Sequence, residues 1–143
     1  MQKIVIFSFI LILAGFGCKK ENLKDAELLN TKWTLTYIQN TKTNTVTLYP
    51  SEATNKISIL FTDSSNIIRF SGVCNGGTGS YTYSSITGEI KISNLVSTEI
   101  YCKYYEWETY TGQNLYDATS YKINGNDLVI YSSGAYNLYF TKN

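Results

Sequence analysis

Hydrophobic and polar residues alternate along most of the chain after residue 31, in short runs separated by turn residues. Alternation at every second position gives a strand one buried face and one solvated face. Residues 33–38 (WTLTYI) are the clearest example and predict the first strand. Further runs predict strands over residues 45–49, 57–61, 67–73, 80–84, 89–95, 121–123, 128–131 and 136–140.

Residues 104–118 break this alternation. Tyr104, Trp107, Leu115 and Ala118 recur at spacings of three and four, which predicts one amphipathic helix. We therefore expect an α+β fold that is mainly β. About eight short antiparallel strands would form a meander that closes into a barrel-like sheet, with the helix inserted late.

The N-terminus carries a different pattern. A short basic start is followed by a continuous apolar run over residues 4–17. Such a run spans roughly 21 Å as a helix, whereas the hydrocarbon core of a bilayer is about 30 Å thick. We interpret residues 1–17 as a signal peptide for export.

Gly17 and Cys18 end this run and resemble the cleavage site of a bacterial lipoprotein, of the type found in Bacteroidetes. The resemblance implies that Cys18 carries lipid, including palmitate, and becomes the mature N-terminus. Residues 18–30 would form the tether and residues 31–143 the folded domain. The alternatives are an ordinary secretory signal cut near Gly17 and an uncleaved anchor.

The chain has three cysteines and no histidine. With Cys18 assigned to lipid, Cys74 and Cys102 are left to form a disulfide in an oxidising compartment. The alternatives are a reactive thiol pair and a two-ligand metal site. A metal would need more soft ligands than these two, so we expect no metal and no cofactor.

The stretch between residues 71 and 81 contains four glycines around Cys74 and Asn75. Because glycine reaches positive φ without strain, we expect an unusual backbone path here, a turn or bulge beside the disulfide. A phosphate-binding loop is disfavoured, since a strand pattern and not a helix follows. Asn75 is expected to satisfy backbone groups of its own turn.

Charges and aromatic residues add little to this picture. Without Lys3 the chain has equal numbers of basic and acidic residues, so nucleic acid is not an expected partner. Glu106 and Glu108 lie two apart on the predicted helix and are interpreted as solvated charges. An aromatic group around the predicted helix consists of Tyr101, Tyr104, Tyr105, Trp107 and Tyr110. It could form a platform for sugars or peptides, but we favour the interpretation that alternate members fill the core.

Several short motifs recur in a fixed order along the chain after residue 31. They comprise Trp33 and Leu35, Phe61, Gly72 with Cys74 and Asn75, Gly79 with Tyr81, Thr98 with Cys102, Leu115, and the hairpin of Tyr121, Ile123, Gly125 and Leu128. Together they resemble the META domain, the family of the heat-inducible HslJ lipoprotein. The resemblance implies a single antiparallel β domain with a helix, an envelope or secreted location and no established enzymatic activity. It also makes Gly72, Asn75, Gly79 and Thr98 the family-signature turn.

We therefore expect a non-enzymatic, lipid-anchored protein of the cell envelope, in the outer membrane and facing either the periplasm or the surface. It would be a monomeric, stress-related structural or interaction module whose partners are the membrane and an unknown envelope protein or ligand. The alternative is a small β-barrel carrier of an apolar ligand, or an envelope inhibitor of a host hydrolase. An enzyme is disfavoured because no nucleophile–base pair can be assembled without histidine.

Overall fold

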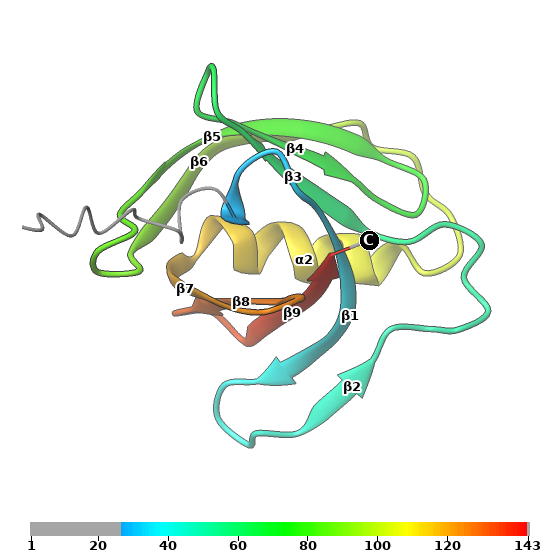
Figure 1. The fold of residues 1–143 in the computed structure, drawn as a ribbon. Helices are drawn as coiled ribbons and strands as arrows, with labels where there is room; N and C mark the ends of the chain where they lie inside the picture. The colour runs from blue at the N-terminus through cyan, green and yellow to red at the C-terminus, as the bar shows by residue number, and fades with distance from the viewer. Residues whose placement is uncertain (1–26, 143) are drawn as a thin grey trace, which may run out of the picture.

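The alternating runs of the chain form strands close to the expected positions. A computed structural model describes residues 27–142, so the expected signal peptide, Cys18 and most of the tether lie outside the described residues. Nine antiparallel strands form one sheet, accompanied by helix α2 (Figure 1). In chain order the elements are β1 (Lys32–Asn40), β2 (Val46–Leu48), β3 (Ser58–Thr62), β4 (Ile67–Ser71), β5 (Gly76–Tyr83), β6 (Ile90–Ser97), α2 (Tyr105–Tyr116), β7 (Ala118–Asn124), β8 (Asp127–Ser132) and β9 (Tyr136–Lys142).

The sheet curls into a half-barrel. Its strand order is β6-β5-β4-β3-β1-β9-β8-β7. Strand β2 lies off this path and pairs with the C-terminal half of β1. The two end strands approach each other where the backbone N–H of Tyr121 donates to the carbonyl of Gly88 at 2.7 Å. An isolated bridge between Glu89 and Ser120 lies beside this bond. The expected mainly β, barrel-like meander with one helix is thus confirmed.

Helix α2 lies inside the curl of the sheet. Figure 1 shows it between an upper layer of β3 to β6 and a lower layer of β7 to β9, with β1 joining the two. The spacing of apolar residues correctly predicts that Trp107 and Leu115 are buried on the helix, whereas Ala118 is buried at the start of β7. The polar residues Glu108, Thr111 and Asn114 are buried on the helix as well. Within the described part of the chain, no helix combines the length and the hydropathy needed to cross a membrane.

The interior of the half-barrel is filled with apolar side chains. Trp33, Phe61 and Phe140 are at most 1% exposed, and Phe61 packs edge-to-face on Tyr81 with ring centroids 5.0 Å apart. The indole N–H of Trp33 donates to the carbonyl of Leu28 at 3.2 Å, and the Leu28 side chain is fully buried. The packed part of the chain therefore includes residues before position 31, where the sequence pattern placed the start of the domain.

Candidate functional site

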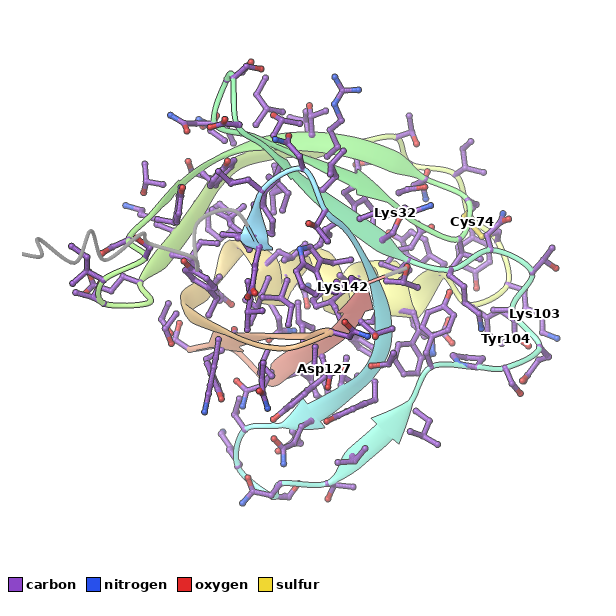
Figure 2. All side chains as sticks on the ribbon, in the orientation of Figure 1. Lys32, Cys74, Lys103, Tyr104, Asp127 and Lys142 are labelled. Atoms are coloured by element: carbon purple, nitrogen blue, oxygen red, sulfur yellow. A yellow bond between two sulfur atoms is a disulfide. The ribbon has the colours of Figure 1, made fainter. Side chains whose placement is uncertain are left out.

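A disulfide joins the turn after β4 to the segment after β6. Cys74 and Cys102 are linked with an S–S distance of 2.14 Å and a Cα–Cα distance of 6.4 Å, as the sequence predicted. Figure 2 shows Cys74 at the same end of the molecule as Lys103 and Tyr104, which precede α2. The disulfide therefore ties the upper layer of the sheet to the chain that enters the helix.

Asn75 lies next to the disulfide and is buried. Its side-chain oxygen accepts hydrogen bonds from the Ile100 backbone N–H at 2.7 Å and the Thr98 hydroxyl at 2.8 Å. Its side-chain nitrogen donates to the Ile100 carbonyl at 2.8 Å. Asn75 was expected to satisfy its own turn, but its amide pairs with the neighbouring segment as another strand would.

Glu108 completes this cluster and corrects a prediction. Interpreting Glu108 as a solvated charge was wrong, because its side chain is only 6% exposed. Its Oε1 accepts from the backbone N–H groups of Cys74 at 2.6 Å and Asn75 at 3.0 Å. Its Oε2 accepts from the Asn75 side-chain amide at 2.6 Å. A carboxylate that receives three N–H donors inside the protein is well stabilised, and Glu108 also lies in the first turn of α2, where the helix dipole favours negative charge.

The Glu108 charge also acts on its surroundings. Burial raises the pKa of the nearby Tyr49 phenol, and the negative charge of Glu108 raises this pKa further. The Tyr49 hydroxyl donates to the carbonyl of Asn55 at 3.0 Å, and its ring packs edge-to-face on Trp107 at 5.2 Å between centroids. Tyr49 is therefore a neutral phenol at neutral pH and serves as packing and as a hydrogen-bond donor.

Close approach requires three of the four glycines of this stretch, Gly72, Gly77 and Gly79. The expected positive φ was wrong, because no glycine between residues 72 and 79 has φ in the left-handed region. Gly76, Gly77 and Gly79 instead lie within β5, and the register against β6 shifts around Gly79, which is the expected bulge. A Cβ at Gly79 would lie 2.8 Å from the Leu95 side chain, and one at Gly72 would lie 2.6 Å from the carboxyl carbon of Glu108. The absent side chain at Gly72 lets the turn reach the helix, and the one at Gly79 lets β5 lie close to β6.

A second buried polar contact holds the other half of the helix. The Asn114 side-chain oxygen accepts from the Tyr136 backbone N–H at 2.8 Å and from the Ser132 hydroxyl at 3.2 Å. Its nitrogen donates to the Tyr110 carbonyl at 2.7 Å. Sequence reasoning missed this residue because a polar side chain at a core spacing gives no indication of its partner. Glu108 and Asn114 thus fix α2 to the upper and lower layers respectively.

The predicted aromatic group does not form a single platform. Trp107 is buried in the core, whereas Tyr101 is 87% exposed. Tyr101 packs on Tyr105 with ring centroids 5.5 Å apart, and Tyr110 packs on Tyr136 at 5.3 Å. The group is therefore divided among the core, the rim and the β9 side of the helix.

A narrow groove of about 210 Å³ lies beside the cluster, between α2 and β6. Its lining includes Glu108 and Asn75, but the polar atoms of both already bind protein groups. Among the described residues, no three or more cysteine, aspartate or glutamate side chains gather in a way that could hold a metal ion. The disulfide and the hydrogen bonds of Asn75 and Glu108 join the turn after β4, the segment after β6 and helix α2, and we call this arrangement the staple.

Comparison with known proteins places this geometry in a family. The META domain model matches residues 26–143, so the chain belongs to the META domain family. The fold is also similar to an NMR structure of a protein from Burkholderia xenovorans, at 18% identity and a TM-score of 0.68 over 85% of this chain and 88% of that one. A crystal structure of a DUF4847 family protein from Bacteroides vulgatus is similar at 13% identity and a TM-score of 0.64, over 83% of this chain and 96% of that one. No curated protein matches the chain. The structural likenesses at these identities show the shared fold.

Proposed function

We propose that this META domain protein is a non-catalytic structural or interaction module of the bacterial cell envelope, anchored by lipid at Cys18. The observation that carries the proposal is the saturation of the candidate site. Both oxygens of Glu108 accept N–H donors, both polar atoms of Asn75 are bonded, and the two cysteines are joined. A general base or nucleophile needs a free lone pair directed at substrate, and these groups direct theirs at the protein.

The disulfide supports a location outside the cytoplasm. Structural disulfides persist in oxidising compartments and are rare where thioredoxin and glutathione keep thiols reduced. The basic start, the apolar run over residues 4–17 and Cys18 are consistent with the same route of export. A mature chain that begins at Cys18 would hold the described domain close to a membrane on a tether of about ten residues.

The filled interior favours a module over a carrier of an apolar ligand. A carrier needs a sizeable cavity lined by apolar groups, whereas here helix α2 and the core side chains occupy the space inside the curl of the sheet. Function on this scaffold is therefore expected at the surface. We also retain the proposal of a monomer, with a stress-related role that rests on the family resemblance alone.

The test uses the full chain expressed in a bacterium with lipoprotein-processing enzymes. Wild type is expected in the membrane fraction and is expected to incorporate labelled palmitate. Cys18→Ser should lose the label and its lipid attachment, whereas the neighbouring control Lys19→Ser should keep both. Unchanged membrane association and labelling of Cys18→Ser would contradict lipid attachment at this residue.

A further inference from the structure

The outer face of the lower layer, continued by β1 and β2, carries an ordered row of side chains that the staple does not use. Strand register aligns Leu48, Tyr37, Tyr139, Val129 and Lys122 across β2, β1, β9, β8 and β7. Directly opposed residues of antiparallel strands share one face, so this row spans roughly 19 Å at the usual strand spacing.

The opposite face of β8 and β9 forms part of the core. Leu128, Ile130, Leu138 and Phe140 alternate with the row and are at most 1% exposed. Helix α2 lies on that inner side in Figure 1. The row therefore faces away from the helix, and its Leu48 is 73% exposed at the β2 end.

Two tyrosines in the row form a fixed aromatic wall. The rings of Tyr37 and Tyr139 stack with centroids 4.2 Å apart and planes inclined by 16°. The Tyr139 hydroxyl donates to the Gln39 side-chain oxygen at 2.7 Å, which holds the ring in place. Because the rings are already ordered, a ligand that binds them loses little side-chain entropy in the protein.

A hollow of about 310 Å³ adjoins this wall, at the small end of the range for ligand sites. Tyr131 and Val129 contribute further apolar surface, while Asn124, Asp127 and Lys122 contribute polar groups. Figure 2 shows Asp127 on the lower layer and apart from Cys74, and the lining of the hollow includes none of Cys74, Asn75 and Glu108. This hollow is therefore separate from the stapled cluster.

The charge of the hollow is balanced. Its lining holds one cation, Lys122, and one anion, Asp127, and the remaining polar groups are phenols, amides and hydroxyls. Burial raises the pKa of Tyr139, and the nearby Tyr37 and Tyr131 raise it further; burial also raises the pKa of Tyr37, so the hydroxyls of the stacked pair are neutral donors and acceptors at neutral pH. A charged ligand finds no net attraction here.

We propose that this hollow binds a neutral saccharide. A pyranose ring has an apolar C–H face that packs on aromatic rings and an edge of hydroxyls that pair with amide, carboxylate and ammonium groups. The tyrosine wall supplies the first kind of contact, and Asn124, Asp127 and Lys122 supply the second. The inference deepens the proposed function, since it names the partner of the envelope module, and it rests on that function only for the extracytoplasmic location.

The test is affinity electrophoresis of the purified full chain through native gels that contain a neutral polysaccharide: hydroxyethyl cellulose, xylan, laminarin, mannan or glycogen. At least one polysaccharide should retard wild type. Tyr139→Ala and Tyr131→Ala should each weaken the retardation about tenfold, the change expected for loss of one aromatic contact. Tyr101→Ala is the matched control, since this tyrosine is 87% exposed at the disulfide end and should leave retardation unchanged.

Tyr131→Ala leaves the stacked pair of Tyr37 and Tyr139 intact and guards against a folding defect, which urea unfolding of each variant would reveal. Absence of retardation by all five polysaccharides would overturn the inference, as would retardation of folded Tyr139→Ala and Tyr131→Ala equal to that of wild type. Binding of protein alone to this face, including a second copy of the chain, would overturn it too. The gel assay does not depend on lipid attachment. A negative result in this assay would therefore overturn saccharide binding without affecting the test of lipid attachment at Cys18.

Discussion

The backbone of Gly72 lies against the carboxyl group of Glu108, and a Cβ at position 72 would lie 2.6 Å from the Glu108 carboxyl carbon. Residue 108 is in the first turn of α2 and residue 72 is in the turn after β4, so the contact joins two elements that are distant in sequence. The missing side chain at Gly72 lets the N–H groups of the turn reach the carboxylate.

We expect Gly72→Ala to destabilise the protein by about 1–3 kcal/mol, the usual effect of overpacking. Glu108 must move, and its bonds to Cys74 and Asn75 weaken when it does. The matched control is Gly112→Ala within α2, where a Cβ meets nothing within 4 Å. That change should stabilise the protein by about 0.5–1 kcal/mol through helix propensity. Urea unfolding measures both, and equal effects at the two glycines would refute the close contact.

The disulfide should contribute roughly 3–4 kcal/mol to the free energy of unfolding by the loop-entropy model, given the sequence separation of 28 residues. The double variant Cys74→Ala, Cys102→Ala should unfold at lower urea concentration but remain folded in water, because Glu108 and Asn75 still join the same segments. Wild type in reducing agent should unfold at a similar urea concentration. A double variant as stable as oxidised wild type would contradict this contribution.

Stability should fall in alkaline solution. Burial, together with the smaller effects of the nearby Tyr83 and Asp63, raises the pKa of Tyr81 to about 12. The phenol is 2% exposed, and its hydroxyl donates to the Thr62 carbonyl at 2.9 Å. Because this folded-state pKa exceeds the unfolded value of about 10, the unfolded chain loses its proton first as the pH rises. The stabilisation is complete below pH ~10 and decreases by about 1–3 kcal/mol up to pH ~12.

Urea unfolding at a series of alkaline pH values, with tyrosinate absorbance recorded in parallel, tests this dependence. Tyr37, Tyr49 and Tyr139 also have raised pKa values and act in the same direction. Tyr81→Phe should be less stable at neutral pH but should lose stability less steeply above pH 10. A slope equal to that of wild type would show that Tyr81 does not titrate in the folded state as described.

Alternation in the sequence predicted the strands because each needs only a buried and a solvated face, which is a local property. The β1 pattern from Trp33 to Ile38 is of this kind. The hairpin turn at Gly125 is local as well, because it depends on a few adjacent residues. The disulfide could also be predicted from the sequence, since the lipid assignment of Cys18 left only Cys74 and Cys102 to pair. These features depend on residue type and order alone.

The stapled cluster was only partly predictable. Glu108 follows Trp107 and lies on the same helix face as Thr111 and Leu115, at spacings of three and seven. This spacing indicates a buried position, but the charge of the side chain favoured an exposed one. Its donors come from a turn more than thirty residues away, and no periodicity encodes that approach. The prediction for the glycines failed for the same reason. Gly72 and Gly79 are required by close contacts with Glu108 and Leu95, which are distant in sequence, and not by unusual φ angles.

The central claim is that Glu108 stabilises the folded protein. The free energy of unfolding of the Glu108→Gln variant tests this claim most directly. Whichever way the glutamine amide turns, its N–H₂ group opposes an N–H donor of Cys74 or Asn75. We expect a loss of about 2–3 kcal/mol, whereas the exposed control Glu106→Gln should change stability by less than about 1 kcal/mol. A Glu108→Gln protein as stable as wild type, or more stable, would contradict the account, because that result is typical of a buried charge kept for chemistry at a cost in stability.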